Sequence, residues 1–308
     1  FFPFGLAKKS TLSDSKSTSA LGGTTREVSE SVVSLRKVTQ SETVMTQSYT
    51  TIKFTIIESV ATITLSRPDA ANAMNPVMAR ELNLAAIECE EHQGLRAVLI
   101  NAEGKLFCAG GDISEFAAAG KQVGALIREM AGDLHLAISR LTRLKAPVIA
   151  AIQGTAAGAG FSLAIAADIS IAADTAKFTM AYTNGGLSPD GSSTYFLPRR
   201  IGDRRARELM LTNRILTAQE AADWGVINQA VPAETLDQTV QQLLKTFRHG
   251  PTLAFGAVKA LLNDSFNNGL ETQMELETRA IADCAMTPDG QEGLHAFLEK
   301  RQANFIGR

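Results

Sequence analysis

Cysteine is scarce in this sequence, and the few that occur give no sign of a disulfide framework. The 308 residues hold three cysteines, Cys89, Cys108 and Cys284, which are far apart and in apolar surroundings. An odd number of isolated cysteines does not predict paired disulfides, and their spacing is not that of zinc ligands. We therefore expect no metal site and a reducing, cytoplasmic location.

An excess of charge of either sign is also lacking. Thirty lysines and arginines face 32 aspartates and glutamates, which leaves a formal net charge of −2. No basic stripe with interleaved aromatic residues is present, so the sequence gives no reason to expect nucleic acid or a membrane surface as a partner. With 45% hydrophobic residues, the composition is that of a globular protein.

Long uninterrupted apolar runs are missing as well. The most apolar stretch, residues 146–168, is broken by Pro147, Gln153 and Asp168, which argues against a membrane helix. A dinucleotide-binding fingerprint is excluded because Leu163 stands where its third glycine would have to be.

Glycines are present in this same stretch, directly after an apolar run at 148–152 that predicts a buried strand. Gly154, Gly158 and Gly160 allow the backbone to approach a ligand closely where a helix begins. Free N–H groups at such a point can stabilise a developing negative oxygen. Tight packing of a helix on a sheet without any chemistry is the alternative.

A second glycine loop lies upstream, at 107–113 (FCAGGDI), after a strand-like run at 97–101. Two such loops could each direct one N–H at the same carbonyl oxygen, which would assemble an oxyanion hole from backbone alone.

The two loops, FCAGGDI and QGTAAGAGFSLAIAAD (153–168), resemble the signature loops of the crotonase (enoyl-CoA hydratase/isomerase) family. The resemblance extends to SRPDAANAMN (66–75), LTAQEAADWG (216–225) and FLEKRQANF (297–305). It implies an acyl-CoA substrate, no cofactor besides the coenzyme A thioester itself, an oxyanion hole from the N–H groups of Gly111 and Ala159, and a homotrimer or hexamer.

Strand and helix patterns alternate along the chain, which predicts an α/β fold with parallel strands. A hairpin is expected at 52–57 and 60–65, and Asn75-Pro76 is expected to start a helix. The resemblance implies a crotonase-like ββα spiral with a C-terminal helical region. We expect a flexible or non-native extension at 1–44, the spiral core at 45–250, and a helical trimerisation or lid region at 251–308.

One departure from the family pattern bears on the reaction. Family hydratases carry two glutamates that handle the water and the proton, and at the matching positions this sequence has Ser162 and Tyr182. Neither side chain can act as a carboxylate base, so ordinary two-glutamate hydration is in doubt.

Asp190, in Leu187-Ser-Pro-Asp-Gly191, is the remaining candidate base, although Pro-Asp-Gly is also ordinary turn sequence. The resemblance places it where ring-epoxide isomerases of phenylacetyl-CoA breakdown carry a proton-transferring aspartate, and where 4-chlorobenzoyl-CoA dehalogenases carry a nucleophile. His135 stands where those dehalogenases have a water-activating histidine, although a lone histidine among leucines is more often a packed one. Gly111 and Tyr182 replace the aromatic residue and tryptophan of the dehalogenase pattern.

Six further residues match coenzyme A contacts of the family. The resemblance implies this role, mostly through backbone, for Arg67, Ala71, Ala73 and Ala109, and a closing role, from the same or a neighbouring subunit, for Phe297 and Lys300. A solvated helix face is the alternative for Lys300.

The sequence therefore favours an enzyme that stabilises a thioester enolate and shifts a double bond by proton transfer through one aspartate. An enoyl-CoA hydratase and a hydrolytic aryl-CoA dehalogenase using Asp190 and His135 are the alternative reactions. A non-catalytic acyl-CoA-binding protein is the alternative class.

Overall fold

The computed structural model describes residues 48–308, so the predicted extension at 1–44 lies outside the described residues. The strands of this part are β1 (Ile52–Ile57), β2 (Val60–Leu65), β3 (Ala97–Ala102), β4 (Val148–Ile152), β5 (Ala156–Ala157), β6 (Ile169–Ala173), β7 (Lys177–Thr179), β8 (Leu216–Thr217) and β9 (Gln229–Val231). Its α-helices are α1 (Pro76–Glu91), α2 (Ile113–Ala118), α3 (Val123–Arg143), α4 (Ala159–Ala166), α5 (Ser193–Ile201), α6 (Asp203–Thr212), α7 (Ala218–Trp224), α8 (Leu236–Arg248), α9 (Thr252–Ser265), α10 (Leu270–Met286) and α11 (Pro288–Leu298).

The larger sheet has the strand order β1-β2-β3-β4-β6-β9. The predicted hairpin is confirmed, since β1 and β2 pair antiparallel around Glu58 and Ser59, which both adopt positive φ. Every later pairing in this sheet is parallel. Parallel neighbours require crossovers, and helices supply them, as the alternating pattern predicts.

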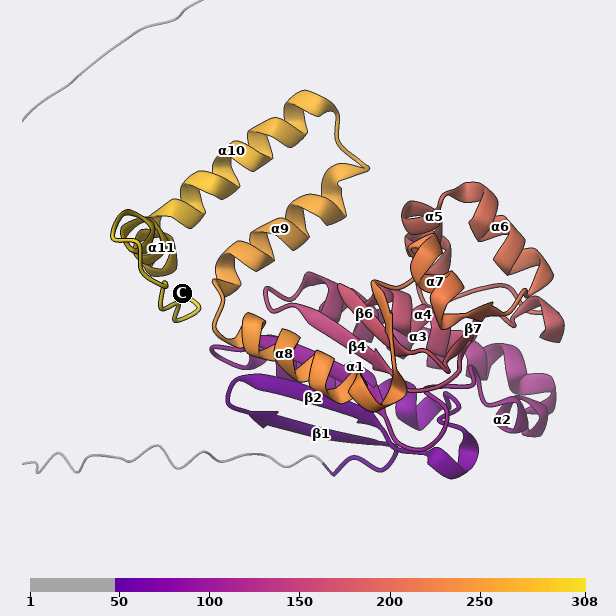
Figure 1. The fold of residues 1–308 in the computed structure, drawn as a ribbon. Coiled ribbons are helices and arrows are strands. Elements are labelled where there is room, and N and C mark those ends of the chain that lie inside the picture. The colour runs from indigo at the N-terminus through magenta and orange to yellow at the C-terminus, as the bar shows by residue number, and fades with distance from the viewer. Residues whose placement is uncertain (1–47) are drawn as a thin grey trace, which may run out of the picture. The chain divides into compact units, whose positions relative to one another are not determined.

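Helices cover both faces of this sheet (Figure 1), so successive side chains of a central strand are buried in two different clusters. In β3, Val98 and Ile100 belong to the main core, whereas Ala97 and Leu99 belong to a second cluster under α8. The main core lies on the side of α1 and α3, which pack against each other. A strand buried on both faces reads as a continuous apolar run, which is what the sequence shows at 97–100 and 148–152.

A small second sheet, with the order β5-β7-β8, stands beyond the carboxyl end of β4. It is joined to the first glycine loop by a parallel bridge between Cys108 and Ala156. The two glycine loops therefore meet at the carboxyl edge of the large sheet, where parallel α/β folds place their ligand sites.

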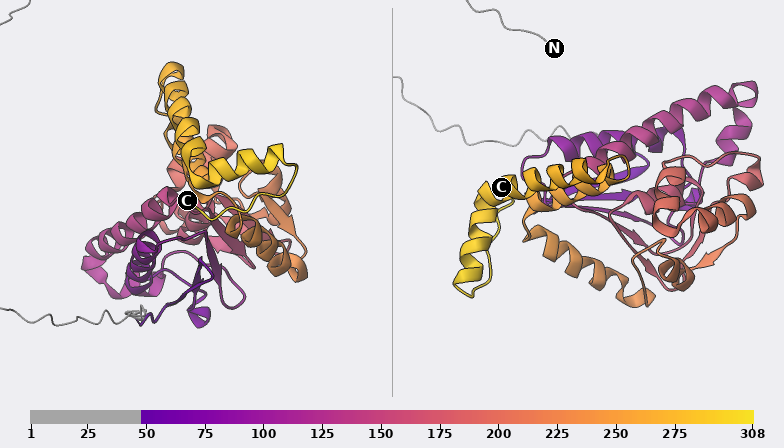
Figure 2. Two further views of the ribbon diagram at one scale, coloured as in Figure 1. Left: turned by 90° about the vertical axis from the view of Figure 1, so that its left-hand side faces the viewer. Right: turned by 90° about the horizontal axis from the view of Figure 1, so that it is seen from above.

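The C-terminal helices α9, α10 and α11 follow α8 (Figures 1 and 2). The end of α9 contacts α5, where the Tyr195 hydroxyl donates to the Asn263 carbonyl at 3.3 Å, whereas α10 and α11 lie apart from α2 and α6. On α9, the buried Lys259 ammonium lies 2.6 Å from the Asp168 carboxylate and donates to the Ala146 carbonyl at 3.0 Å. The ion pair ties α9 to the start of β6, and the hydrogen bond to Ala146 ties it to the start of β4. Among residues 48–308, each helix is too short or too polar to cross a bilayer.

Candidate active site at the carboxyl edge of the sheet

The two glycine loops are in direct backbone contact. A Cβ added to Gly160 would lie 2.5 Å from the Cβ and carbonyl oxygen of Cys108, and one added to Gly154 would lie 2.0 Å from the Lys105 carbonyl oxygen. Gly110 and Gly158, both at positive φ, also face each other, since a Cβ on Gly158 would lie 3.3 Å from the Gly110 Cα. Glycine is needed here because any side chain would push the loops apart.

The N–H groups of Gly111 and Ala159 are the donors that the sequence predicts for an oxyanion hole. Ala159 is the first residue of α4, so its N–H has no acceptor within the helix. Within the described part of the chain, neither N–H donates to a protein acceptor, although the neighbouring Asp112 and Gly158 N–H groups do. Both groups are thus free to bind an oxygen, and they project from loops that touch.

An ion pair between Arg67 and Asp112, the residue after Gly111, holds the Gly111 loop in place. The Arg67 guanidinium lies 3.0 Å from Asp112 Oδ2 and also donates to the Ala73 carbonyl. Asp112 caps α2 by accepting from the N–H groups of Ser114 and Glu115. Burial would raise the pKa of Asp112, but the hydrogen bonds from Ser114 and Arg67 outweigh it and hold that pKa below its usual range.

The segment 67–73 lies against this loop through its backbone. The Ala109 N–H donates to the Ala71 carbonyl at 3.1 Å, and the buried Asn72 amide donates to the carbonyls of Glu103 and Leu106. Because the Arg67 side chain is engaged with Asp112, this segment offers a ligand mainly backbone groups. Four of the predicted coenzyme A contacts, Arg67, Ala71, Ala73 and Ala109, are therefore gathered beside Gly111.

Asp190 lies in a hydrogen-bonded cluster with Ser162 and Tyr182, the two residues that the sequence resemblance matches to the glutamates of family hydratases. The Tyr182 hydroxyl donates to Asp190 Oδ1 at 2.7 Å, and the hydroxyl oxygens of Ser162 and Tyr182 are 3.0 Å apart. The Asp190 carbonyl lies 2.9 Å from the Ser162 hydroxyl and 2.8 Å from that of Ser193. Burial, followed by the negative charge of Asp190, raises the pKa of Tyr182 above its ordinary value, so Tyr182 remains a donor.

His135, on α3, approaches the same carboxylate from another side. Its Nε2 lies 3.7 Å from Asp190 Oδ2 and accepts the Gly191 N–H at 3.1 Å. An imidazole nitrogen that accepts a hydrogen bond carries no proton, so this geometry belongs to a neutral ring with its proton on Nδ1. The side chains of Asp190 and His135 are 27% and 50% exposed, which leaves both within reach of a ligand.

The aspartate cluster lies next to the two glycine loops, whereas Phe297 and Lys300, which are predicted to contact coenzyme A, lie elsewhere in the chain. Gly158 precedes Ala159, and a Cβ on it would lie 4.0 Å from the Tyr182 ring, whose hydroxyl bonds Asp190. Phe297, 83% exposed on α11, and Lys300 beyond it stand on the C-terminal helices, far from α2 and α5 (Figure 1). A single chain therefore brings together Asp190, His135, Gly111 and Ala159, with Arg67, Ala71, Ala73 and Ala109 beside Gly111.

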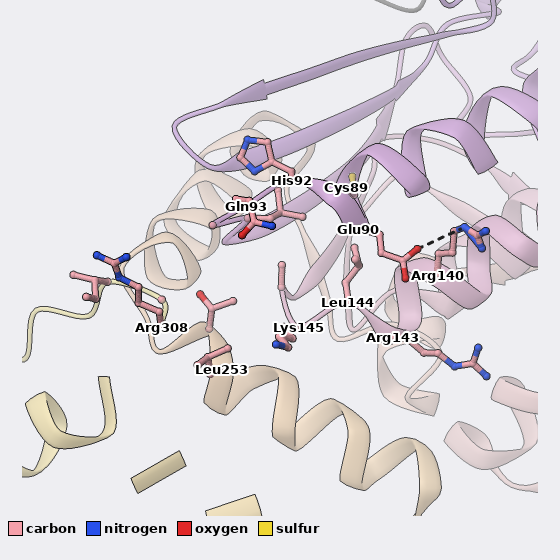
Figure 3. Close-up of a pocket in the computed structure, with 16 residues that line it drawn as sticks. Cys89, Glu90, His92, Gln93, Arg140, Arg143, Leu144, Lys145, Leu253 and Arg308 are labelled. Carbon is pink, nitrogen blue, oxygen red and sulfur yellow. Dashed lines mark ion pairs between the residues drawn. The ribbon is translucent and has the colours of Figure 1, made fainter. Parts of the chain in front are cut away.

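A pocket of about 680 Å³ lies at the opposite edge of the sheet, before β3 and β4, and none of the predicted site residues lines it. Figure 3 shows it between the ends of α1 and α3 and the start of α9. Two of its three arginines have partners within the chain, since Arg140 lies 3.8 Å from Glu90 and Arg143 donates to the Ser139 hydroxyl. We assign the chemistry to the carboxyl edge, where the free N–H groups and the aspartate meet.

Sequence reasoning missed the partnership of Ser162 and Tyr182 with Asp190. It treated both residues as replacements, Ser162 for a family glutamate and Tyr182 for a family glutamate and for the dehalogenase tryptophan. The available signal was their nature, since a serine and a tyrosine at two glutamate positions keep hydrogen-bonding groups while removing charge. The Phe116 ring covers Gly111, since a Cβ added to Gly111 would lie 2.8 Å from it.

Comparisons with known proteins agree with this architecture. The family described as "Enoyl-CoA hydratase/isomerase" matches residues 55–308. A Rhodobacter capsulatus protein named "Probable enoyl-CoA hydratase" is 39% identical over 261 residues, covering 85% of this chain and 100% of the relative. The 1,2-epoxyphenylacetyl-CoA isomerase of Escherichia coli K12 is 37% identical over 255 residues, covering 82% of this chain and 96% of the relative.

A solved structure supports the same assignment. The crystal structure of an enoyl-CoA hydratase from Bacillus anthracis superimposes with a TM-score of 0.79 at 30% identity, covering 84% of this chain and 100% of that one. The chain therefore belongs to the enoyl-CoA hydratase/isomerase family, with the mixed α/β fold of the crotonases. It is an enzyme of this acyl-CoA family, as the sequence predicts.

Proposed function

We propose that the enzyme moves a carbon–carbon double bond in an acyl-CoA thioester by proton transfer through Asp190. The observation that carries this proposal is the cluster in which Tyr182 and Ser162, standing at the hydratase glutamate positions, hydrogen-bond to Asp190. One carboxylate surrounded by neutral donors suits the removal and return of a proton better than the activation of water by two acids.

In the proposed reaction, the N–H groups of Gly111 and Ala159 hold the thioester carbonyl oxygen of a 3-enoyl-CoA. Asp190 removes a proton from carbon 2, and the electron pair of that C–H bond forms a dienolate whose charge reaches the carbonyl oxygen. The protonated Asp190 then returns the proton to carbon 4, which leaves the double bond between carbons 2 and 3. Two preorganised N–H donors lower the cost of this enolate, and one such donor is typically worth roughly 3 to 4 kcal/mol.

Coenzyme A binding is proposed for the segment beside Gly111. The backbone of Arg67, Ala71, Ala73 and Ala109 offers hydrogen-bonding groups there, and the Arg67–Asp112 pair keeps that backbone in place. Phe297 and Lys300 are proposed to act on coenzyme A from a neighbouring subunit, because their own chain holds them away from this site. No cofactor beyond the thioester substrate is proposed.

We also propose the homotrimer or hexamer that the family resemblance implies, since the contribution of Phe297 and Lys300 needs a neighbouring subunit. Large apolar side chains are exposed along the C-terminal helices: Leu270, Met274, Ile281, Met286, Leu294, Phe297 and Leu298. A contiguous set of this kind is typical of a surface that a partner covers. We also propose a cytoplasmic location, which suits three cysteines that are all free.

A short 3-enoyl-CoA, incubated with the enzyme and with an Asp190→Asn variant, tests the proposal. We expect a 2-enoyl-CoA of unchanged mass with the wild type and a rate at least about 1,000-fold lower with the variant, because the amide cannot accept the proton. A 2-enoyl-CoA in a parallel incubation tests the hydratase alternative, since water adds only to the double bond conjugated with the thioester, and a product heavier by one water would identify that activity. Binding of both esters without either product would identify an acyl-CoA-binding protein.

Hydrolytic dehalogenation is a second candidate, favoured by the 3.7 Å separation of His135 Nε2 and Asp190 Oδ2. In that reaction Asp190 would bond to the chlorine-bearing ring carbon of 4-chlorobenzoyl-CoA, chloride would leave, and water activated by His135 would hydrolyse the aryl ester. Chloride release, absent in Asp190→Asn and His135→Gln, is the readout. Engagement of Nε2 by the Gly191 N–H makes this the weaker candidate.

A further inference from the structure

The Tyr182 side chain spans the distance between the oxyanion loop and the aspartate. Its ring lies against Gly158, directly before the Ala159 donor, and its hydroxyl reaches Asp190 Oδ1 at 2.7 Å. One rigid ring with two rotatable bonds thus sets the spacing between the group that would hold the carbonyl oxygen and the group that would remove the proton.

We propose that Tyr182 is a positioning residue that selects Oδ2 of Asp190 as the proton-accepting atom. This inference rests on the proposed function and adds the atom that performs it. The terminal torsion of an aspartate is broad and nearly two-fold, so an unrestrained carboxylate exchanges its two oxygens. A hydrogen bond from Tyr182 to Oδ1 removes that freedom and leaves Oδ2 facing away from the tyrosine.

Ser162 completes the restraint from α4. Its hydroxyl lies 2.9 Å from the Asp190 carbonyl, 3.2 Å from the Gly158 carbonyl and 3.0 Å from the Tyr182 oxygen. Because it is fully buried, it cannot exchange these partners for water. Because the Tyr182 proton is donated to Asp190, the single hydroxyl proton of Ser162 is available either to the Asp190 carbonyl or to the Tyr182 oxygen, and in either case it supports the turn that carries Asp190.

The opposite oxygen has different neighbours. His135 Nε2 lies 3.7 Å from Oδ2, beyond hydrogen-bond distance, and is occupied by the Gly191 N–H. Oδ2 is thus left with a lone pair that neither Tyr182 nor His135 uses, as a base requires. An aspartate bound in this way can act only with one oxygen, and always from the same direction.

Tyr182→Phe tests the inference, because it keeps the ring against Gly158 and removes only the hydroxyl. The matched control is Tyr49→Phe, since Tyr49 also donates its hydroxyl to a carboxylate, Glu88, but at the β1–α1 side of the molecule. Double-bond migration is measured for each variant as kcat and KM across pH, together with thermal unfolding.

We expect kcat to fall about 10- to 100-fold in Tyr182→Phe, with KM changed much less, because a hydrogen bond to a charged group is lost where the proton is transferred. Tyr49→Phe should change neither quantity.

A double-mutant cycle adds an independent test. Ser162→Ala should lower kcat in the same direction but by a smaller factor. Combined with Tyr182→Phe, it should cost less than the product of the two single effects, because both substitutions release the same carboxylate. Multiplying effects would mean that Ser162 and Tyr182 act separately, which contradicts the proposed restraint.

The inference is overturned if Tyr182→Phe loses thermal stability but keeps the kcat and KM of the wild type, since Tyr182 would then be only structural. That outcome leaves the proposed function intact. If the wild type itself moves no double bond, or moves it equally well as Asp190→Asn, the proposed function fails instead, so the two failures are distinguishable.

Discussion

Gly160 lies directly against Cys108, with no room between them for a side chain. A Cβ on Gly160 would stand 2.5 Å from both the Cβ and the carbonyl oxygen of Cys108, closer than real atoms approach. This contact presses the start of α4 onto the loop that carries Gly111, and so brings the Gly111 and Ala159 N–H groups to the same edge of the sheet.

Gly160→Ala should therefore damage both stability and activity. Overpacking of this kind costs about 1 to 3 kcal/mol of the free energy of unfolding, and separation of the loops should lower kcat about 10-fold or more, since small displacements of donors weaken enolate stabilisation. Gly124→Ala on α3 is the control, because a Cβ there meets nothing within 4 Å. It should gain about 0.5 to 1 kcal/mol from helix propensity. The free energy of unfolding in urea and the isomerase kcat are measured for both variants. If Gly160→Ala changes neither quantity more than Gly124→Ala does, the contact with Cys108 does not hold the loops together.

Asp112→Asn should remove a pH-dependent part of the stability. The pKa of Asp112 lies below its usual range because Ser114 and Arg67 hydrogen-bond its carboxylate in spite of burial. A depressed carboxyl pKa stabilises the fold above the unfolded value, about 3.9, and this contribution is lost as the pH falls through the folded value. Wild type should thus exceed Asp112→Asn by about 1 to 3 kcal/mol near neutral pH, and the gap should narrow below about pH 4.

Chemical unfolding at several pH values measures this gap. The control is Asp283→Asn, an exposed position on α10, which should stay within about 0.5 kcal/mol of the wild type at every pH. A gap between wild type and Asp112→Asn that stays constant down to pH 3 would show that the ion pair with Arg67 has no part in the stability.

Lys259→Met should lower the free energy of unfolding strongly, because Lys259 lies buried between α9 and the core. Lys259 is buried and pairs with Asp168 at 2.6 Å. Within residues 48–308, loss of this ammonium leaves the Asp168 carboxylate with the Val148 N–H as its remaining hydrogen-bond donor. Breaking a buried pair on one side costs about 3 to 5 kcal/mol. Arg279→Met, which breaks an exposed pair with Glu275 on α10, should cost less than about 0.5 kcal/mol. If Lys259→Met and Arg279→Met lower the midpoint of thermal unfolding by similar amounts, the buried pair contributes no more to stability than the exposed one.

Much of the fold could be predicted because local pattern and long-range packing agree. The hairpin predicted at 52–57 and 60–65 and the strand predicted at 148–152 match β1, β2 and β4 to the residue. Asn75 caps α1 by accepting the Met78 N–H, as Asn-Pro sequences favour. The small sheet of β5, β7 and β8 was not predicted, because strands of two or three residues carry no periodic signal.

The site was predictable in its parts rather than in its arrangement. Gly111, Ala159 and Asp190 follow from motifs, but the bond between Tyr182 and Asp190 depends on how the turn at 183–190 folds back. Local sequence describes Asp190 equally well as a turn residue. Only the tertiary fold places α4, and with it Ser162, against this turn.

The C-terminal helices provide a test of assembly. We expect light scattering after size exclusion to give the mass of three or six chains, because α10 and α11 expose Ile281, Met286 and Phe297 at 72%, 79% and 83%. Ile281→Asp should shift the mass toward the monomer. Ile57→Asp, an equally exposed position at the end of β1, should not. A monomeric wild type would rule out the contribution of Phe297 and Lys300 from a neighbouring subunit.

The central claim is that Asp190 is the one base that removes and returns the proton. The most direct measurement is the incubation of a short 3-enoyl-CoA in heavy water with wild type and Asp190→Asn, followed by mass spectrometry and NMR of the acyl chain. In the wild type we predict migration of the double bond and deuterium at carbons 2 and 4, to the extent that the proton on Asp190 exchanges with solvent before it is returned. In Asp190→Asn we predict neither migration nor exchange. Undiminished exchange in Asp190→Asn would contradict the account and assign the proton transfer to another group.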